Sequence, residues 1–169
     1  MIAYILILVS LLLDGILSNF FPYIQNTLSW WTPLFTVTSI FFFYPMYRKK
    51  RNLYYGILFG TGVLYDLLYT NLLFFHGVIF VILGYFLYWM HKNFEVTSLR
   101  LLIYIPIFLF CYEFLTGSIL WIFQVVPVTF SKILYKASHS ILMNILYAEI
   151  IYFLLKIIPK KYKNQKING

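Results

Sequence analysis

NLYYGILFGTGVLYDLLYTNLLFFHG, residues 52–77, is an apolar stretch interrupted by one carboxylate side chain, Asp66. An unpaired carboxylate at the centre of a bilayer costs roughly 2.5 to 3.5 kcal/mol, so Asp66 is expected to face protein or a polar cavity. Gly62, Asp66 and Thr70 follow one another at intervals of four residues and therefore share one face of a helix. We predict a helix over about residues 53–70 and expect it to be the hub of a bundle.

Two further glycines lie earlier in the same stretch. Gly56 and Gly60 form a G-x-x-x-G step, which lets two membrane helices approach closely where no hydrophobic effect drives their association. The predicted surface for packing another helix, from this chain or from a partner, consists of five residues: Gly56, Gly60, Gly62, Asp66 and Thr70.

The composition places the chain in the membrane class. It is 62% hydrophobic with a mean hydropathy of +0.83 and only 11% charged, whereas soluble domains carry roughly 25% charged residues. At roughly 20 residues per span, 169 residues allow about six transmembrane helices. We therefore predict an all-α integral membrane protein with a single bundle over residues 1–158 and a basic cytoplasmic tail over residues 159–169. The single cysteine, Cys111, excludes an intrachain disulfide.

Hydropathy and stop signals give the order of the spans and their orientation. The expected spans cover about residues 2–21, 31–47, 53–70, 72–90, 101–126 and 138–158, the first of them kept as a span because no basic leader precedes it. With a cytoplasmic N-terminus, eleven of the 13 Lys and Arg residues lie on inner rims, including the cluster Arg48, Lys49, Lys50 and Arg51. The net charge of +8 thus indicates topology and no nucleic-acid partner.

Four carboxylates lie within the predicted spans: Asp14, Asp66, Glu113 and Glu149. No Lys or Arg lies deep in a span, so we expect these groups to be protonated, hydrogen-bonded or paired with another chain, without an ion pair inside this one. The three histidines, His76, His91 and His139, lie near predicted rims without ligand spacing, which favours interfacial hydrogen bonds over a metal site. A faint repeat relates Leu12, Asp14, Ser18 and Asn19 to Leu64, Asp66, Thr70 and Asn71.

The glycines at 56, 60 and 62, the run Asp66-Leu67-Leu68 and the later Gly77, together with Asp14 in the first span, resemble the rod shape-determining protein MreD family. The resemblance covers most of the chain in size and span layout. Its specific part is confined to residues 56–77, and the heavy use of Phe and Tyr departs from rod-cell members. It implies a non-enzymatic partner of MreC in the complex that directs peptidoglycan synthesis during cell elongation. It also implies a fold similar to the membrane-embedded substrate-binding subunits of energy-coupling-factor vitamin transporters.

Three functions follow as hypotheses. The leading one is a scaffold in the bacterial plasma membrane, with both termini cytoplasmic, that binds an MreC-like single-span protein and, through it, cell-wall synthases. The alternative is a substrate-binding subunit of a vitamin-type transporter, with the four carboxylates around a central pocket. The third, an intramembrane aspartyl protease using Asp14 and Asp66, is disfavoured because Val63 follows Gly60-Thr61-Gly62 where such enzymes need aspartate. No catalytic residue, cofactor or metal is predicted.

Overall fold

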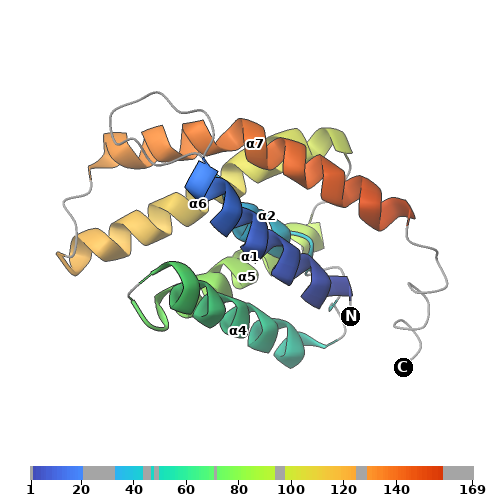
Figure 1. Ribbon diagram of the computed structural model, residues 1–169, viewed down its shortest axis with the longest axis horizontal. Helices are drawn as coiled ribbons and strands as arrows, with labels where there is room; N and C mark the ends of the chain where they lie inside the picture. Colours follow the sequence, from blue (N-terminus) through green and yellow to red (C-terminus); the bar gives the residue numbers. More distant parts are fainter. Residues whose placement is uncertain are drawn as a thin grey trace.

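The computed structural model describes residues 2–20, 33–43, 47, 50–70, 72–93, 98–124 and 129–157. Within these ranges all regular secondary structure is α-helical, as the sequence predicts (Figure 1). The helices, in chain order, are α1 (Ile2–Phe20), α2 (Phe35–Ile40), α4 (Arg51–Tyr69), α5 (Phe75–Asn93), α6 (Ser98–Ile122) and α7 (Phe130–Ile157). The predicted basic tail lies outside the described residues, as do Arg48 and Lys49 of the charge cluster and Asn71 of the faint repeat.

The long helices match the predicted apolar stretches, with one clear difference at α7. That helix begins at Phe130, whereas the sequence suggested a start near residue 138. Lys132 and Lys136 were expected on a rim between helices, but they lie in the first two turns of α7. Their four-residue spacing puts both ammonium groups on one exposed face, so the helix accommodates them without burying charge.

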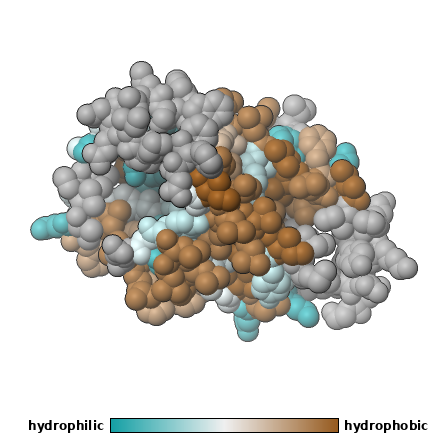
Figure 2. Space-filling model, viewed as in Figure 1, coloured by the Kyte–Doolittle hydropathy of each residue, from teal (hydrophilic) through white to brown (hydrophobic). Residues whose placement is uncertain are grey.

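Two helices are long and apolar enough to cross a membrane, Arg100–Ile122 and Phe130–Ile157. A third apolar helix, Tyr4–Leu17, is shorter. Large apolar side chains are exposed along α1, α4, α5, α6 and α7, and Figure 2 shows them covering much of one face of the molecule.

The predicted second span takes an unexpected form. Its described part contains α2, only six residues long, and every residue from 33 to 43 is buried. The remainder of that predicted span lies largely outside the described residues. Residues 33–43 are surrounded by protein on all sides, which suits their four phenylalanines, Phe35, Phe41, Phe42 and Phe43. The buried hydroxyls of Thr38 and Ser39 have hydrogen-bond partners on α7 and α1.

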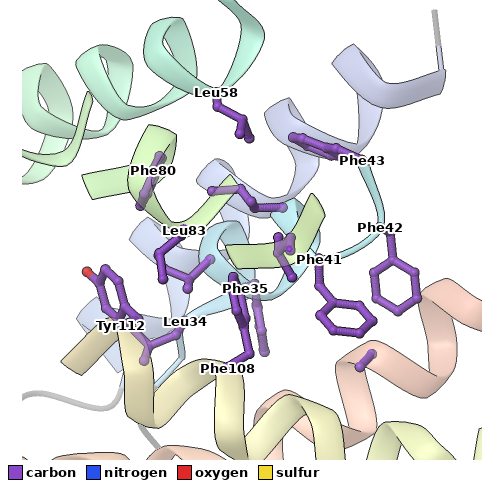
Figure 3. Close-up of a cluster of buried hydrophobic side chains, with 14 of the residues drawn as sticks. Leu34, Phe35, Phe41, Phe42, Phe43, Leu58, Phe80, Leu83, Phe108 and Tyr112 are labelled. Atoms are coloured by element: carbon purple, nitrogen blue, oxygen red, sulfur yellow. The ribbon is translucent and has the colours of Figure 1, made fainter. Parts of the chain in front are cut away.

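The centre of the molecule is α2, and the prediction that the Asp66 helix is the hub is wrong. α2 contacts α1, α5, α6 and α7, whereas α4 packs chiefly against α5 and also touches α1. Figure 3 shows aromatic and leucine side chains from these helices meeting around α2, with Phe80 and Leu83 from α5 and Phe108 from α6. The apolar stretch around Asp66 forms one side of the molecule (Figure 1).

Candidate functional site

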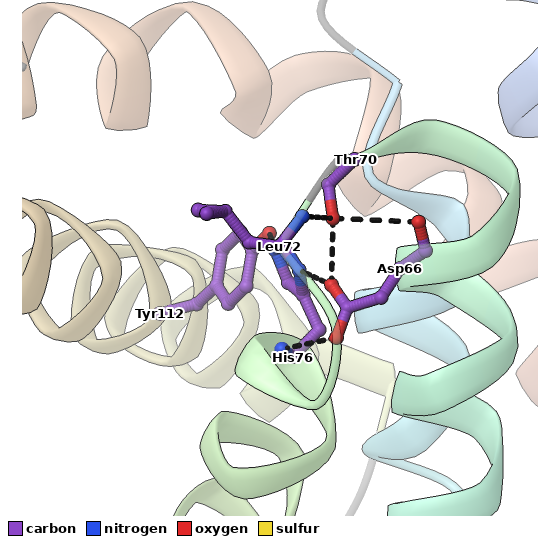
Figure 4. A network of polar contacts seen from close by, with 5 residues as sticks. All are labelled: Asp66, Thr70, Leu72, His76 and Tyr112. Carbon is purple, nitrogen blue, oxygen red and sulfur yellow. Dashed lines mark hydrogen bonds and ion pairs between the residues drawn. The ribbon is translucent and has the colours of Figure 1, made fainter. Parts of the chain in front are cut away.

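Asp66 lies on the face of α4 that meets the start of α5. Its Oδ2 accepts the backbone N–H of His76 at 2.9 Å, and its Oδ1 lies 2.6 Å from Nδ1 of the same histidine (Figure 4). The Thr70 hydroxyl, one turn along α4, donates to Oδ1 at 2.8 Å. Both carboxylate oxygens are therefore occupied, although the side chain is almost completely buried.

This arrangement follows from the way helices begin. The first N–H groups of a helix have no acceptor within the helix and carry partial positive charge. α5 starts at Phe75, so the N–H of His76 is one of these groups, and Asp66 satisfies it from the preceding helix. A buried carboxylate in an apolar chain is thus explained as a cap for the next helix.

Gly62 makes the close approach of the two helices possible. A Cβ atom at this position would lie 2.4 Å from the His76 carbonyl oxygen and 2.4 Å from the Gly77 nitrogen. Real Cβ atoms do not approach backbone atoms so closely, so only glycine fits without moving one helix. Gly62, Asp66 and Thr70 therefore lie together on the face of α4 toward α5.

The histidine extends the network to a third helix. Nε2 of His76 lies 3.1 Å from the Tyr112 hydroxyl on α6, and the imidazole packs between Tyr65 and Phe80, with ring centroids 4.7 and 5.8 Å away. With Asp66 ionised, Nδ1–H donates to the carboxylate and Nε2 accepts from Tyr112. Asp66 thus has a hydrogen-bonded partner inside the chain, in line with one of the states expected for the buried carboxylates, and the contact is an ion pair only when the imidazole is protonated.

Asp14, on α1, has the same role at α2. Its Oδ1 accepts the N–H of Phe35 at 2.7 Å, and its Oδ2 accepts the N–H of Thr36 at 2.9 Å. Asn144, on α7, completes this end of α2, since its Oδ1 accepts from the Leu34 N–H at 3.1 Å and from the Thr38 hydroxyl at 3.0 Å.

The other two carboxylates lie on different helices. Glu113 is buried on α6, and Glu149 is half-buried on α7. Asp14 accepts hydrogen bonds from the start of α2, whereas Asp66 accepts them from Thr70 and from the start of α5. The two aspartates therefore cap different helices. Among the described residues, no three His, Cys, Asp or Glu side chains are grouped so that they could hold a metal ion.

Gly56 and Gly60 lie elsewhere on α4. Both are exposed, and a Cβ atom added to either would meet nothing within 4 Å. Leu53, Leu64 and Leu67 are exposed at the spacing that places them on the same face of α4, opposite Gly62. We call these five residues the glycine face, and no described helix covers the two glycines.

His76, Tyr112 and the capping role of Asn144 were missed by the sequence analysis. His76 lies ten residues after Asp66, at the start of the next predicted helix, and that spacing was the available signal. Nothing in the sequence pointed to Tyr112 among 16 tyrosines.

No known protein family, curated protein or solved structure matches the chain.

Proposed function

We propose that this protein is a non-enzymatic, multi-pass membrane scaffold whose glycine face binds the transmembrane helix of a partner. The observation that carries the proposal is the exposure of Gly56 and Gly60 on the side of α4 away from α5, while the hydrogen bonds of Asp66 hold the other side of α4 to α5. α4 is thereby fixed on one side and left with a shallow apolar surface on the other.

Placement in a membrane is supported by the outer surface. Large apolar side chains are exposed along all five long helices, and extended exposed apolar surface is typical of contact with a membrane or with another protein. Lys50, Lys92, Arg100 and Lys156 lie at helix ends that the alternating directions of successive helices bring to one end of the molecule, where α1 begins and α7 ends (Figure 1). Under the positive-inside rule this end is cytoplasmic, in agreement with about six spans and cytoplasmic termini.

The shape of the glycine face fits a helix better than it fits a small molecule. In lipid, helices associate by close packing at small residues, because lipid tails are as apolar as leucine. Gly56 and Gly60 form the floor of this surface, and Leu53, Leu64 and Leu67 supply the sides against which a second helix packs. With the resemblance to MreD, the expected partner is an MreC-like single-span protein and, through it, cell-wall synthases and the regulation of cell shape.

Co-purification from detergent tests the proposal. Wild-type protein, Gly60→Leu and the control Ile103→Phe would each be affinity-tagged, and the recovered partners would be quantified by mass spectrometry. Ile103→Phe adds bulk to an exposed site on α6, so it controls for any added apolar volume. We expect Gly60→Leu to lose a single-span wall-synthesis partner and Ile103→Phe to keep it. Unchanged recovery in a folded Gly60→Leu variant would exclude this face as the interface.

The transporter alternative receives less support from the contacts. Asp14 and Asp66, which it places around a central pocket, are occupied by the N-terminal N–H groups of α2 and α5. A soluble-vitamin screen by thermal shift tests it, and strong stabilisation by one vitamin would favour this function over the scaffold.

A further inference from the structure

Arg51, the first residue of α4, lies over three tyrosine rings. Its guanidinium carbon is 5.6, 5.4 and 5.1 Å from the ring centroids of Tyr55, Tyr85 and Tyr88, and its Nη2 donates to the Tyr85 hydroxyl at 3.1 Å. Tyr55 lies one turn along α4, and the other two tyrosines lie on α5. These contacts restrict the position of a long, exposed side chain. Most surface arginines have no such contacts.

Other cations extend the site. Lys50 precedes Arg51 directly, and Lys92 follows Tyr88 by one turn of α5, so it lies on the same face of that helix. Both lysines are exposed. A guanidinium is charged at every physiological pH, so Arg51 gives the site a permanent positive charge.

From this juxtaposition we infer that Arg51, with Lys50, Lys92 and the three tyrosines, forms a binding site for the headgroup of an anionic phospholipid. The guanidinium fork matches the geometry of a phosphate, and its five N–H groups outnumber the one hydrogen bond to Tyr85. Tyrosine rings have an apolar body and a polar tip, and they favour the headgroup level of a bilayer. This combination suits a phosphate attached to acyl chains better than a free phosphate ion.

The site is separate from the glycine face. Arg51 and Tyr55 lie on the side of α4 that faces α5, whereas Gly56 and Gly60 lie on the opposite side. Lipid binding and partner binding can therefore fail independently, and one experiment does not decide the other.

The test uses full-length protein in a neutral detergent, with thermal unfolding measured during titration with phosphatidylglycerol, phosphatidylcholine or inorganic phosphate. Phosphatidylglycerol is expected to raise the unfolding midpoint, and the other two are not. One cation near a membrane surface contributes about fivefold in affinity, so Arg51→Gln should bind phosphatidylglycerol about fivefold more weakly. Lys132→Gln removes the same charge from the opposite end of the molecule and should bind as wild type does.

Three other results would count against a specific lipid site at Arg51. Wild-type affinity in Arg51→Gln, or an equal loss in Lys132→Gln, would overturn it in favour of general electrostatic attraction. Equal stabilisation by inorganic phosphate would overturn the assignment to a lipid. If Arg51→Gln does not fold, Arg51→Lys replaces it, because this variant keeps the charge and loses the planar stacking on the tyrosines. Weaker binding of phosphatidylglycerol by Arg51→Lys would support the site. Unchanged binding would contradict it.

Discussion

The Asp14 junction and the Asp66 junction solve the same problem with different contacts. In each, a carboxylate on one helix accepts N–H groups at the start of the next helix in the described chain, α2 for Asp14 and α5 for Asp66. The faint repeat around the two aspartates thus coincides with a common structural role. The described residues include both carboxylates, while the side chain of Ser18, which corresponds to Thr70, lies outside them.

The two junctions differ in what the carboxylate bonds to. Asp14 is held by the backbone N–H groups of Phe35 and Thr36, which can only donate. Asp66 bonds to one backbone N–H and to two groups that can change their role, the His76 imidazole and the Thr70 hydroxyl. From this difference we predict that Asp14 tolerates replacement by asparagine less well than Asp66 does.

The largest effect is expected where the Asp66 junction is closest. Gly62→Ala puts a methyl group 2.4 Å from backbone atoms of His76 and Gly77, so α4 and α5 must separate and the Asp66 cap is strained. We expect a loss of about 3 kcal/mol of stability, measured by loss of the helical circular dichroism signal on heating in detergent.

Two other glycines serve as controls for this prediction. At the Asp14 junction, Gly15→Ala meets the Tyr69 hydroxyl at 2.8 Å, the end of a side chain that can shift, so its cost should be smaller. The exposed Gly60→Ala should gain about 0.5 to 1 kcal/mol from the higher helix propensity of alanine. An equal loss in all three variants would show that the close approach at Gly62 is not the cause.

The second effect tests the rigid junction. Asp14→Asn keeps the size of the side chain but turns an NH₂ group toward one of two backbone N–H groups, which is then buried without an acceptor. The expected loss is about 2 kcal/mol by thermal unfolding. A variant as stable as wild type would mean that α2 does not need a double acceptor.

A smaller effect is expected at the far end of the Asp66 network. Tyr112→Phe removes the hydroxyl that lies 3.1 Å from Nε2 of His76 and leaves the ring in place. The loss should be about 1 kcal/mol, the ordinary contribution of one hydrogen bond. The NMR resonances of the His76 ring should shift as well, and an unchanged ring environment would argue against the contact with α6.

The smallest effect distinguishes the two junctions directly. In Asp66→Asn, the amide oxygen can accept the His76 N–H while the NH₂ group donates to Thr70 and to Nδ1, with the imidazole proton moved to Nε2. We expect a cost below about 1 kcal/mol, less than that of Asp14→Asn under the same conditions. A larger loss of stability in Asp66→Asn than in Asp14→Asn would show that the two junctions do not differ in this way.

The long helices and the side of α4 that carries Asp66 were predictable because they depend on local patterns. Apolar stretches locate the helices, and four-residue spacing places Gly62, Asp66 and Thr70 on one face. The pairing of Asp66 with His76 was not predicted, since histidine near a predicted rim was expected to bond at the interface. Its burial depends on α6 packing over it, which no local pattern reports.

The central position of α2 could not be predicted from the sequence for a related reason. A run of aromatic and β-branched residues looks like a span, and hydropathy does not distinguish lipid from a protein core. The six-residue helix exists where it does because Asp14 and Asn144 satisfy its first N–H groups from 21 and 110 residues away. Such contacts become visible only when the helices are assembled.

The contacts of α2 also bear on how the protein is made. Leu34 bonds to Asn144, and Ser10 bonds to the Tyr147 hydroxyl across 137 residues. During synthesis the ribosome delivers α1 and α2 long before α7 emerges. Asp14 on α1 can accept the Phe35 and Thr36 N–H groups as soon as α2 is made, whereas the Leu34 N–H has its acceptor only after α7 is inserted. The interior of the protein is therefore completed by its last helix.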